Sequence, residues 1–326
     1  MTGGLSSPSR PGARESSHRS RVLFALLGLL FAIPACSNQG DRPGLRPSRS
    51  LGGGSHPSPS TISPTSDPGH VVMIVMENKE YSSVIGSTRA PYMNSLANTF
   101  ALAKAYQANA HPSLPDYLDL IAGQDFGIHD DKDSHLFHAQ SLVDQLEAAG
   151  FTWRAYFEGL PADGEAPCPF PSVGSGYQKK HNPFAYFANV QDRTSRCLNI
   201  VPFSLATDLP TDLPNFTWIG PNLCHAMHDC SIETGDAWLA ATVPAILRRL
   251  SGHDLLFVVF DEGTSRAGGG GHVACIVAGP GARAGASSTM AFSHFSLLKT
   301  IEERFGLGYL AHAGDPSVTD MSSLLR

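Results

Sequence analysis

The sequence predicts an α/β fold, a three-layer α/β/α sandwich built on a mostly parallel sheet. Continuous apolar runs at residues 71–76 (VVMIVM) and 255–260 (LLFVVF) are typical of strands that are covered on both faces. Segments with helical character alternate with these strands, as in parallel α/β proteins. The composition agrees, because 42% of the 326 residues are hydrophobic and only 16% are charged.

The other predicted elements are, in chain order, a helix at 90–99, strands at 151–157 and 216–220, a helix at 237–250, a strand at 273–278 and a helix at 296–305. The helix at 237–250 is predicted from one apolar stripe, which is formed by Leu239, Val243, Ile246, Leu247 and Leu250. Ligands of such sheets bind beyond the carboxyl ends of the strands. The residues that follow each strand therefore decide the function.

The first 35 residues predict a signal peptide. Arginines precede an uninterrupted apolar run at residues 22–32, which is too short to cross a bilayer as a helix. The sequence Ile33-Pro34-Ala35-Cys36 resembles a lipobox, in which Cys36 is lipidated. Pro34 is not the usual residue there, so plain secretion is the alternative. We expect an exported protein, either a cell-surface lipoprotein or a secreted one, that meets the membrane only through this anchor.

We predict that residues 36–69 consist of the lipidated Cys36 and a disordered linker. Of the 33 residues after Cys36, 20 are Ser, Pro or Gly, so the segment cannot bury enough surface to fold. Residues 70–326 form the predicted catalytic domain. The net charge of −6 argues against binding nucleic acid through general basicity.

The remaining cysteines predict two disulfides, because export implies oxidising conditions. Cys224 and Cys230 are six residues apart, and Cys168 and Cys197 flank an aromatic insertion. Cys275 lies in an apolar run and is expected to be a buried free thiol. A zinc site is the alternative, although the spacings do not match a structural zinc pattern.

Oxygen-bearing side chains follow two of the predicted strands. Glu77 and Asn78 come directly after the first strand, and Asp261 and Glu262 come after the strand at 255–260. Together they offer three carboxylates and an amide oxygen, which suit a divalent metal ion. The alternative is that polar residues only mark the strand ends.

Between these pairs lies the segment His111-Pro112-Ser113-Leu114-Pro115. Pro115 fits the first turn of a helix and would place Ser113 at or near its N-cap. A hydroxyl there faces free N–H groups and a positive dipole end, which favour phosphate binding and an alkoxide nucleophile. The alternative is that Ser113 only caps the helix.

Histidines lie next to two further predicted strands. The sequence between Cys224 and Cys230 carries His225, His228 and Asp229, and His272 precedes the strand at 273–278. Histidine donates to phosphate oxygens or protonates a leaving group, although a single one is more often structural.

The chain resembles a phosphoesterase family of the alkaline phosphatase superfamily, which contains bacterial acid phosphatases and phospholipases C. The motifs that carry the resemblance are, in order, Val75-Met76-Glu77-Asn78, HPSLPDY at 111–117, Pro221-Asn222, His228-Asp229, Phe260-Asp261-Glu262-Gly263 and Phe292-Ser293-His294-Phe295-Ser296. The resemblance covers residues 70–310 and implies an alkaline-phosphatase-like core.

The resemblance also implies roles for individual residues. Metal ligands would be Glu77, Asn78, Ser113, Asp261 and Glu262, which hold a single divalent metal ion of unknown identity. Ser113 would also be the nucleophile. His228 and His272 would complete the catalytic residues, and the substrate contacts would be His111, Asn222 and Asp229.

The function predicted from these residues is metal-dependent hydrolysis of phosphate monoesters through a phosphoserine, as in an acid phosphatase or a phosphoinositide phosphatase. The substrate is a phosphate ester, either a small molecule or a lipid head group. A phospholipase C-type phosphodiesterase is the nearest alternative, in which aromatic residues of the insertion at 158–193 shape the leaving-group pocket. An inert surface-binding lipoprotein is the alternative from another class.

The lipobox resemblance gives the first testable prediction. Cys36→Ser removes the only thiol that could carry the lipid in this motif, so the variant is expected to be released from the membrane or to stall in maturation. Fractionation of producing cells measures this. Unchanged membrane retention of the variant would rule out the lipoprotein interpretation.

Overall fold

The computed structural model describes residues 68–326, except residues 162–167, 169, 175 and 205–208. The predicted signal peptide, Cys36 and all but the last two residues of the linker lie outside the described residues. Within the described ranges, no helix has both the length and the apolar character that crossing a membrane requires.

The described part of the chain contains one eight-stranded sheet with the order β4-β3-β5-β1-β6-β7-β2-β8. Its strands are β1 (Val71–Met76), β2 (Ala101–Gln107), β3 (Trp153–Glu158), β4 (Ile200–Phe203), β5 (Phe216–Gly220), β6 (Leu255–Phe260), β7 (His272–Ala278) and β8 (Ala286–Ser293). Only β7 runs against its neighbours β6 and β2, so the sheet is mostly parallel, as predicted.

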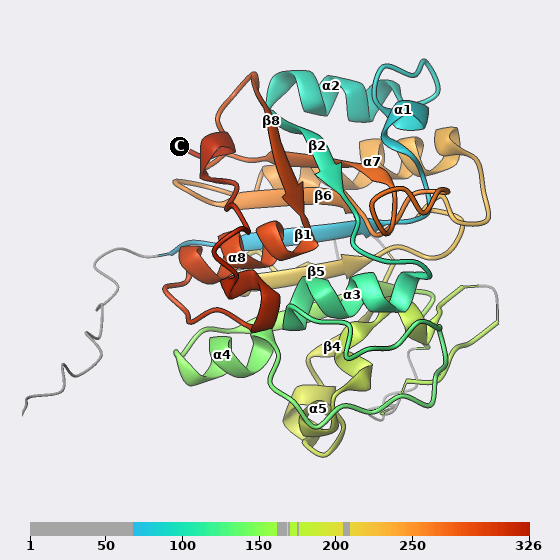
Figure 1. The fold of residues 1–326 in the computed structure, drawn as a ribbon, viewed down its shortest axis with the longest axis vertical. Helices are drawn as coiled ribbons and strands as arrows, with labels where there is room; N and C mark the ends of the chain where they lie inside the picture. The colour runs from blue at the N-terminus through green and yellow to red at the C-terminus, as the bar shows by residue number, and fades with distance from the viewer. Residues whose placement is uncertain (1–67, 162–167, 169, 175, 205–208) are drawn as a thin grey trace, which may run out of the picture. The chain divides into compact units, whose positions relative to one another are not determined.

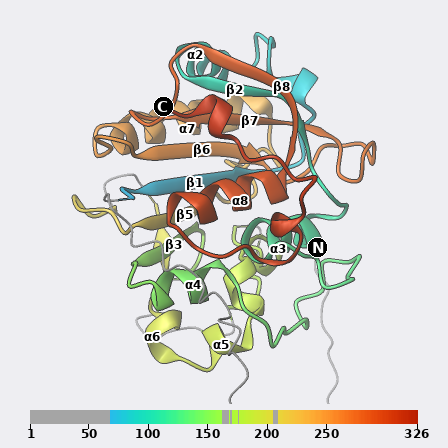
Figure 2. The same cartoon turned by 60° about the vertical axis from the view of Figure 1, so that its left-hand side comes forward.

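Helices cover both faces of this sheet (Figures 1 and 2). The α-helices are α1 (Tyr81–Val84), α2 (Pro91–Thr99), α3 (Ser113–Ala122), α4 (Leu142–Ala148), α5 (Ala188–Gln191), α6 (Thr194–Cys197), α7 (Ile232–Leu247) and α8 (His294–Arg304). Short 3₁₀ helices are η1 (Lys179–His181), η2 (Pro183–Tyr186), η4 (Ala311–Gly314) and η5 (Ser322–Leu324). Helix α3 packs against α8 and α4 on one face, and α2 packs against α7 on the other. The predicted three-layer arrangement is therefore confirmed.

The strands with continuous apolar runs lie where the sequence predicts them. Every residue of β1 and β6 is buried, because helices cover both sides of the centre of the sheet. Three strands were not predicted. The sequences of β2 (ALAKAYQ) and β8 (ASSTMAFS) are rich in alanine or polar residues, and β4 (IVPF) is short and contains a proline.

The predicted helix bounds at 237–250 are wrong at both ends. Helix α7 starts at Ile232, because Ser231 is its N-cap and its hydroxyl accepts a hydrogen bond from the Thr234 N–H. It ends at Leu247, so Leu250 lies beyond it. The apolar stripe marks the buried face of a helix but not its caps.

Both predicted disulfides are present, Cys168–Cys197 and Cys224–Cys230, and Cys275 is the buried free thiol among the described cysteines. Thiols paired in this way are not available as zinc ligands. The aromatic residues on or near the insertion are at most 2% exposed and belong to the core: Tyr156, Phe157, Phe170, Tyr177, Phe184, Tyr186 and Phe187. They therefore fill the interior beneath the insertion.

Helix α8 buries the carboxyl group of Glu302, which forms no ion pair with the other described residues. Glu302 is fully buried, its Oε1 accepts a hydrogen bond from the Leu310 N–H at 2.8 Å, and its Oε2 has no hydrogen-bond partner. Burial raises the pKa of Glu302 to about 8. An exposed Glu ionises near pH 4.5, so folding takes up a proton between about pH 4.5 and 8. The stability therefore falls as the pH rises through that range.

Glu302→Gln keeps an acceptor for the Leu310 N–H and cannot ionise. We expect its melting temperature to exceed that of the wild type at pH 8, by about 2–4 °C for each kcal/mol gained, and to match it at pH 4. Thermal unfolding across this pH range measures the effect. Glu303→Gln changes the exposed neighbour and is the control. An equal gain at both pH values would contradict the proposed ionisation.

Candidate active site

The centre of the site is formed by the carboxyl ends of β1 and β6. These strands are parallel neighbours, with Met76 opposite Phe260, so Glu77 and Asp261 leave the sheet side by side. Both carboxyl groups are at most 1% exposed. Burial and the nearby charge of Asp261 raise the pKa of Glu77 well above its usual range, and burial also raises the pKa of Asp261. Such a pair calls for a compensating cation.

Asn78 and Tyr117 hold these two carboxylates in place. Asn78 has a positive φ of 54°, and its backbone N–H donates to Asp261 Oδ1 at 3.1 Å. Its side-chain amide donates to Glu77 Oε2 at 3.3 Å. The Tyr117 hydroxyl, on α3, donates to Glu77 Oε1. His181 Nε2 lies 3.3 Å from Glu77 Oε2, and its side chain is 6% exposed.

Ser113 is the first residue of α3 and lies at the same edge of the sheet. Its hydroxyl is buried and donates to Glu262 Oε1 at 3.1 Å. Pro112 occupies the N-cap position and makes no side-chain cap hydrogen bond. The second Glu262 oxygen, Oε2, contacts His111 Nδ1. The Ser113 hydroxyl therefore binds a carboxylate of the cluster and does not cap the helix.

A buried network fixes the loop that carries His111 and Ser113. Asp116 accepts hydrogen bonds from the backbone N–H groups of Asn109 and Ala110, at 2.8 and 2.9 Å. His294 Nε2 lies 3.3 Å from Asp116 Oδ1 and 2.6 Å from the carbonyl oxygen of Asp261. Burial raises the pKa of Asp116 to about 6, although His294 opposes the shift. The network ties the start of α3 to the end of β6.

The glycine run before His272 supports the same loop. A Cβ on Gly269, which has a φ of 111°, would lie 2.0 Å from the carbonyl oxygen of Asn109. A Cβ on Gly270 would lie 2.2 Å from that of Ala110. Only glycine permits this close backbone contact.

The loop closed by Cys224–Cys230 brings His228 toward the cluster. The His228 ring lies 5.9 Å from the ring of His181, and its Nδ1 pairs with Asp229 Oδ1 at 2.7 Å. His228 is thus linked to Glu77 through His181. Asn222 has a different environment: its Oδ1 accepts hydrogen bonds from two backbone N–H groups of its own turn, those of Cys224 and His225.

His272 lies at the start of β7, where its contacts are with other residues. Its Nε2 is 2.9 Å from the carbonyl oxygen of Lys104, and its ring stacks on Tyr81 at 4.4 Å. The structure therefore brings six of the predicted site residues into one contact network: Glu77, Asn78, His111, Ser113, Asp261 and Glu262. His228 and its partner Asp229 lie at the edge of this network, beside His181. The side chains of Asn222 and His272 have partners of their own.

The donor atoms of this cluster suit a divalent cation chemically. Asp261 Oδ2 is buried and makes no hydrogen bond, although buried polar atoms normally have partners. Glu262 Oε2 and His181 Nε2 are buried as well, and they face His111 Nδ1 and Glu77 Oε2. Carboxylates of this kind are ligands for hard divalent metals. Among the described residues, no group of three His, Cys, Asp or Glu side chains is yet arranged to coordinate an ion. The residues thus fit a metal by their type and burial.

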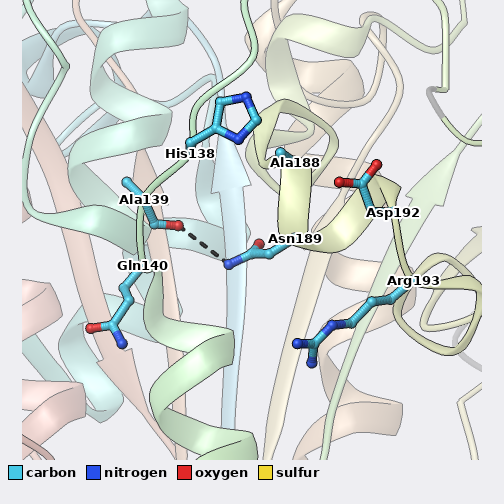
Figure 3. A pocket seen from close by; sticks show the side chains of 7 residues that line it. All are labelled: His138, Ala139, Gln140, Ala188, Asn189, Asp192 and Arg193. Atoms are coloured by element: carbon cyan, nitrogen blue, oxygen red, sulfur yellow. Dashed lines mark hydrogen bonds between the residues drawn. The ribbon is translucent and has the colours of Figure 1, made fainter. Parts of the chain in front are cut away.

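A separate hollow of about 480 Å³ lies between the segment before α4 and helix α5 (Figure 3). It is lined by His138, Ala139, Gln140, Ala188, Asn189, Asp192 and Arg193, and Asn189 donates to the carbonyl oxygen of Ala139 there. None of these residues was predicted in the site.

Four residues of the site were missed by sequence reasoning as contributors: Asp116, Tyr117, His181 and His294. Three of them stand in segments that carry the family resemblance, 111–117 and 292–296, so a closer interpretation of those motifs could have found them. His181 lies in the insertion, and no sequence pattern points to it.

Comparisons with known proteins relate the chain to a family of phosphoesterases. The Phosphoesterase family profile matches residues 87–308. The chain is 35% identical over 264 residues to the phosphatidylinositol-3-phosphatase of Mycobacterium tuberculosis, over 77% of this chain and 82% of that protein. It is 28% identical over 261 residues to a probable acid phosphatase of Kluyveromyces lactis, over 76% of this chain and 61% of that protein.

A solved structure supports the fold. A Vibrio parahaemolyticus protein of the alkaline phosphatase superfamily matches with a TM-score of 0.50 and 11% identity, over 76% of this chain and 70% of that one. The alkaline-phosphatase-like core implied by the motifs is confirmed. The profile match, the 35% identical relative and the common fold agree, and the chain belongs to the Phosphoesterase family.

Proposed function

We propose that this phosphoric ester hydrolase removes phosphate from monoesters through a covalent phosphoserine at Ser113. The observation that supports it most is the position of the Ser113 hydroxyl. It lies at the start of α3 and donates to Glu262, beside the buried pair Glu77 and Asp261. The helix N-terminus and its N–H groups favour a bound phosphate there.

Glu77, Asn78, Asp261 and Glu262 would hold a divalent cation together with Ser113. Such an ion, when bound, lowers the pKa of a hydroxyl and neutralises phosphate charge. The buried Asp261 Oδ2, which makes no hydrogen bond, and the buried Glu262 carboxylate beside it support this role. Without a cation, the pKa of Glu77 is raised, so the pair favours sharing a proton.

The residues then have separate tasks. Ser113 Oγ attacks phosphorus and forms the phosphoserine, while its proton passes to Glu262, to which it is hydrogen-bonded. The leaving alcohol takes a proton from a histidine, and His228, paired with Asp229, is the candidate. In the second step, water attacks phosphorus with that histidine as the base, the bond between phosphorus and Ser113 Oγ breaks, and Glu262 returns the proton to Ser113.

The relatives favour a monoesterase over the inert surface-binding alternative. The 35% identical relative is named for phosphatidylinositol 3-phosphate, so a lipid head group is a candidate substrate beside small phosphate esters. The phospholipase C-type alternative relied on insertion aromatics, and these are buried in the core. The two disulfides support export to an oxidising compartment, with anchoring through Cys36 left to the fractionation test.

Ser113→Ala tests the nucleophile. The variant is expected to fold normally and to lose activity by several orders of magnitude, because the covalent route is lost. Ser141→Ala is the matched control, since Ser141 caps α4 in a capping box. It should lose about 1 kcal/mol of stability and keep its activity. Hydrolysis of a chromogenic phosphate monoester and acid-quench labelling of the Ser113 peptide are the measurements. Near-normal turnover in Ser113→Ala would contradict the proposal.

Removal of the metal is a separate test. EDTA is expected to abolish activity and added divalent metal to restore it. Glu77→Gln or Asp261→Asn should lose both bound metal and activity while the fold persists, because each removes a buried charged ligand. Metal content by elemental analysis, circular dichroism and turnover are measured, with Glu303→Gln as control. A metal-free wild type with full activity would overturn the metal requirement.

A further inference from the structure

The backbone N–H next to the proposed nucleophile is already used by a carboxylate. Leu114, the second residue of α3, donates its N–H to Asp131 Oδ1 at 2.9 Å. Asp131 belongs to the loop between α3 and α4 and is separated from Leu114 by 17 residues. An anion from the chain itself thus lies at the helix end where a substrate phosphate is expected.

The other oxygen of the same carboxylate binds a lysine. Lys180 Nζ lies 3.0 Å from Asp131 Oδ2, and the two side chains are 19% and 27% exposed. Lys180 is also close to the carboxylate pair. Burial opposes its charge, but Asp131, Glu77 and Asp261 together raise the pKa of Lys180. Its ammonium group therefore stays charged beside the site.

The neighbours of Lys180 point in different directions. The adjacent Lys179 donates to the carbonyl oxygen of Asp133 at 2.7 Å and lies over the ring of Tyr186, so it is used within the insertion. The adjacent His181 is buried, and its Nε2 makes no hydrogen bond and faces Glu77. Lys180 therefore faces Asp131 and His181 faces Glu77, so two adjacent residues of the insertion contact two carboxylates of the site.

The two partners of Asp131, a helix N–H group and a lysine ammonium, are groups that also bind phosphate. Phosphate oxygens bind helix N–H groups and form charge-assisted bonds with ammonium groups, as a carboxylate does. We infer that Asp131 is an internal anion in the substrate phosphate position, and that Lys180 exchanges it for the phosphate when substrate binds. Lys180 then determines phosphate affinity, and Asp131 competes with the phosphate. The inference rests on the proposed function and deepens it.

Binding of inorganic phosphate to the purified protein, measured by titration calorimetry, tests this without turnover. Lys180→Gln is expected to weaken phosphate binding about tenfold or more, because a charge-assisted bond is lost. Asp131→Asn is expected to tighten it severalfold, since the competing charge is removed. Lys132→Gln and Asp130→Asn make the same charge changes at a neighbouring, more exposed pair and should leave the affinity unchanged.

The kinetics of a phosphate monoester give a second readout. Lys180→Gln should raise KM more than it lowers kcat, and Lys180→Arg should recover part of the affinity even if Lys180→Gln folds poorly. Equal phosphate affinity in Lys180→Gln and Lys132→Gln would overturn the inference. So would an Asp131→Asn variant that loses thermal stability with no gain in affinity, because Asp131 would then only support α3. Phosphate binding without turnover in the wild type would instead reject the proposed function and leave this inference standing.

Discussion

The parallel register of β1 and β6 is the constraint on which the rest of the site depends. It places Met76 opposite Phe260, so that Glu77 and Asp261 emerge together from the most deeply buried part of the sheet. Two carboxylates in such a position are costly unless something compensates their charge. The surrounding groups offset this cost. Asn78 and Tyr117 donate hydrogen bonds to the carboxylates, and the positive charge of Lys180 lies nearby.

Helix α3 connects this buried pair to the surface loops. Its first turn carries Ser113, Leu114 and Asp116, and Tyr117 follows directly. Each of these residues makes its hydrogen bond to a different part of the site. The helix is buried along its whole length, so these directions are fixed by packing. A rigid support of this kind is what a reaction at one hydroxyl requires.

The sequence predicts the centre of the sheet and much of the site, because both depend on local patterns. Continuous apolar runs identify β1 and β6, and the polar residues directly after them, Glu77 and Asp261, follow from the topology. Strands such as β2 and β8 were missed, since alanine and serine carry little strand signal and pairing with neighbours decides the outcome.

The contacts that complete the site could not be predicted. Tyr117 reaches Glu77 across 40 residues of sequence, and His294 reaches Asp261 across 33. Such pairs depend on how α3 and α8 pack on the sheet, which no local pattern encodes. The roles of His228 and His272 remain predictions. Their positions differ, since His228 lies by His181 and His272 by Tyr81.

The Cys168–Cys197 disulfide makes the order of one part of the site depend on redox conditions. It joins two cysteines that are 29 positions apart, and Lys180 and His181 lie between them, so two groups of the site belong to a loop held by a covalent bond. In a reducing cytoplasm this bond does not form, and the loop keeps the larger conformational freedom of an open chain. A chain folded there would lack this covalent constraint on the loop that carries Lys180 and His181. Protein for biochemical work is accordingly best produced by secretion or refolded under oxidising conditions.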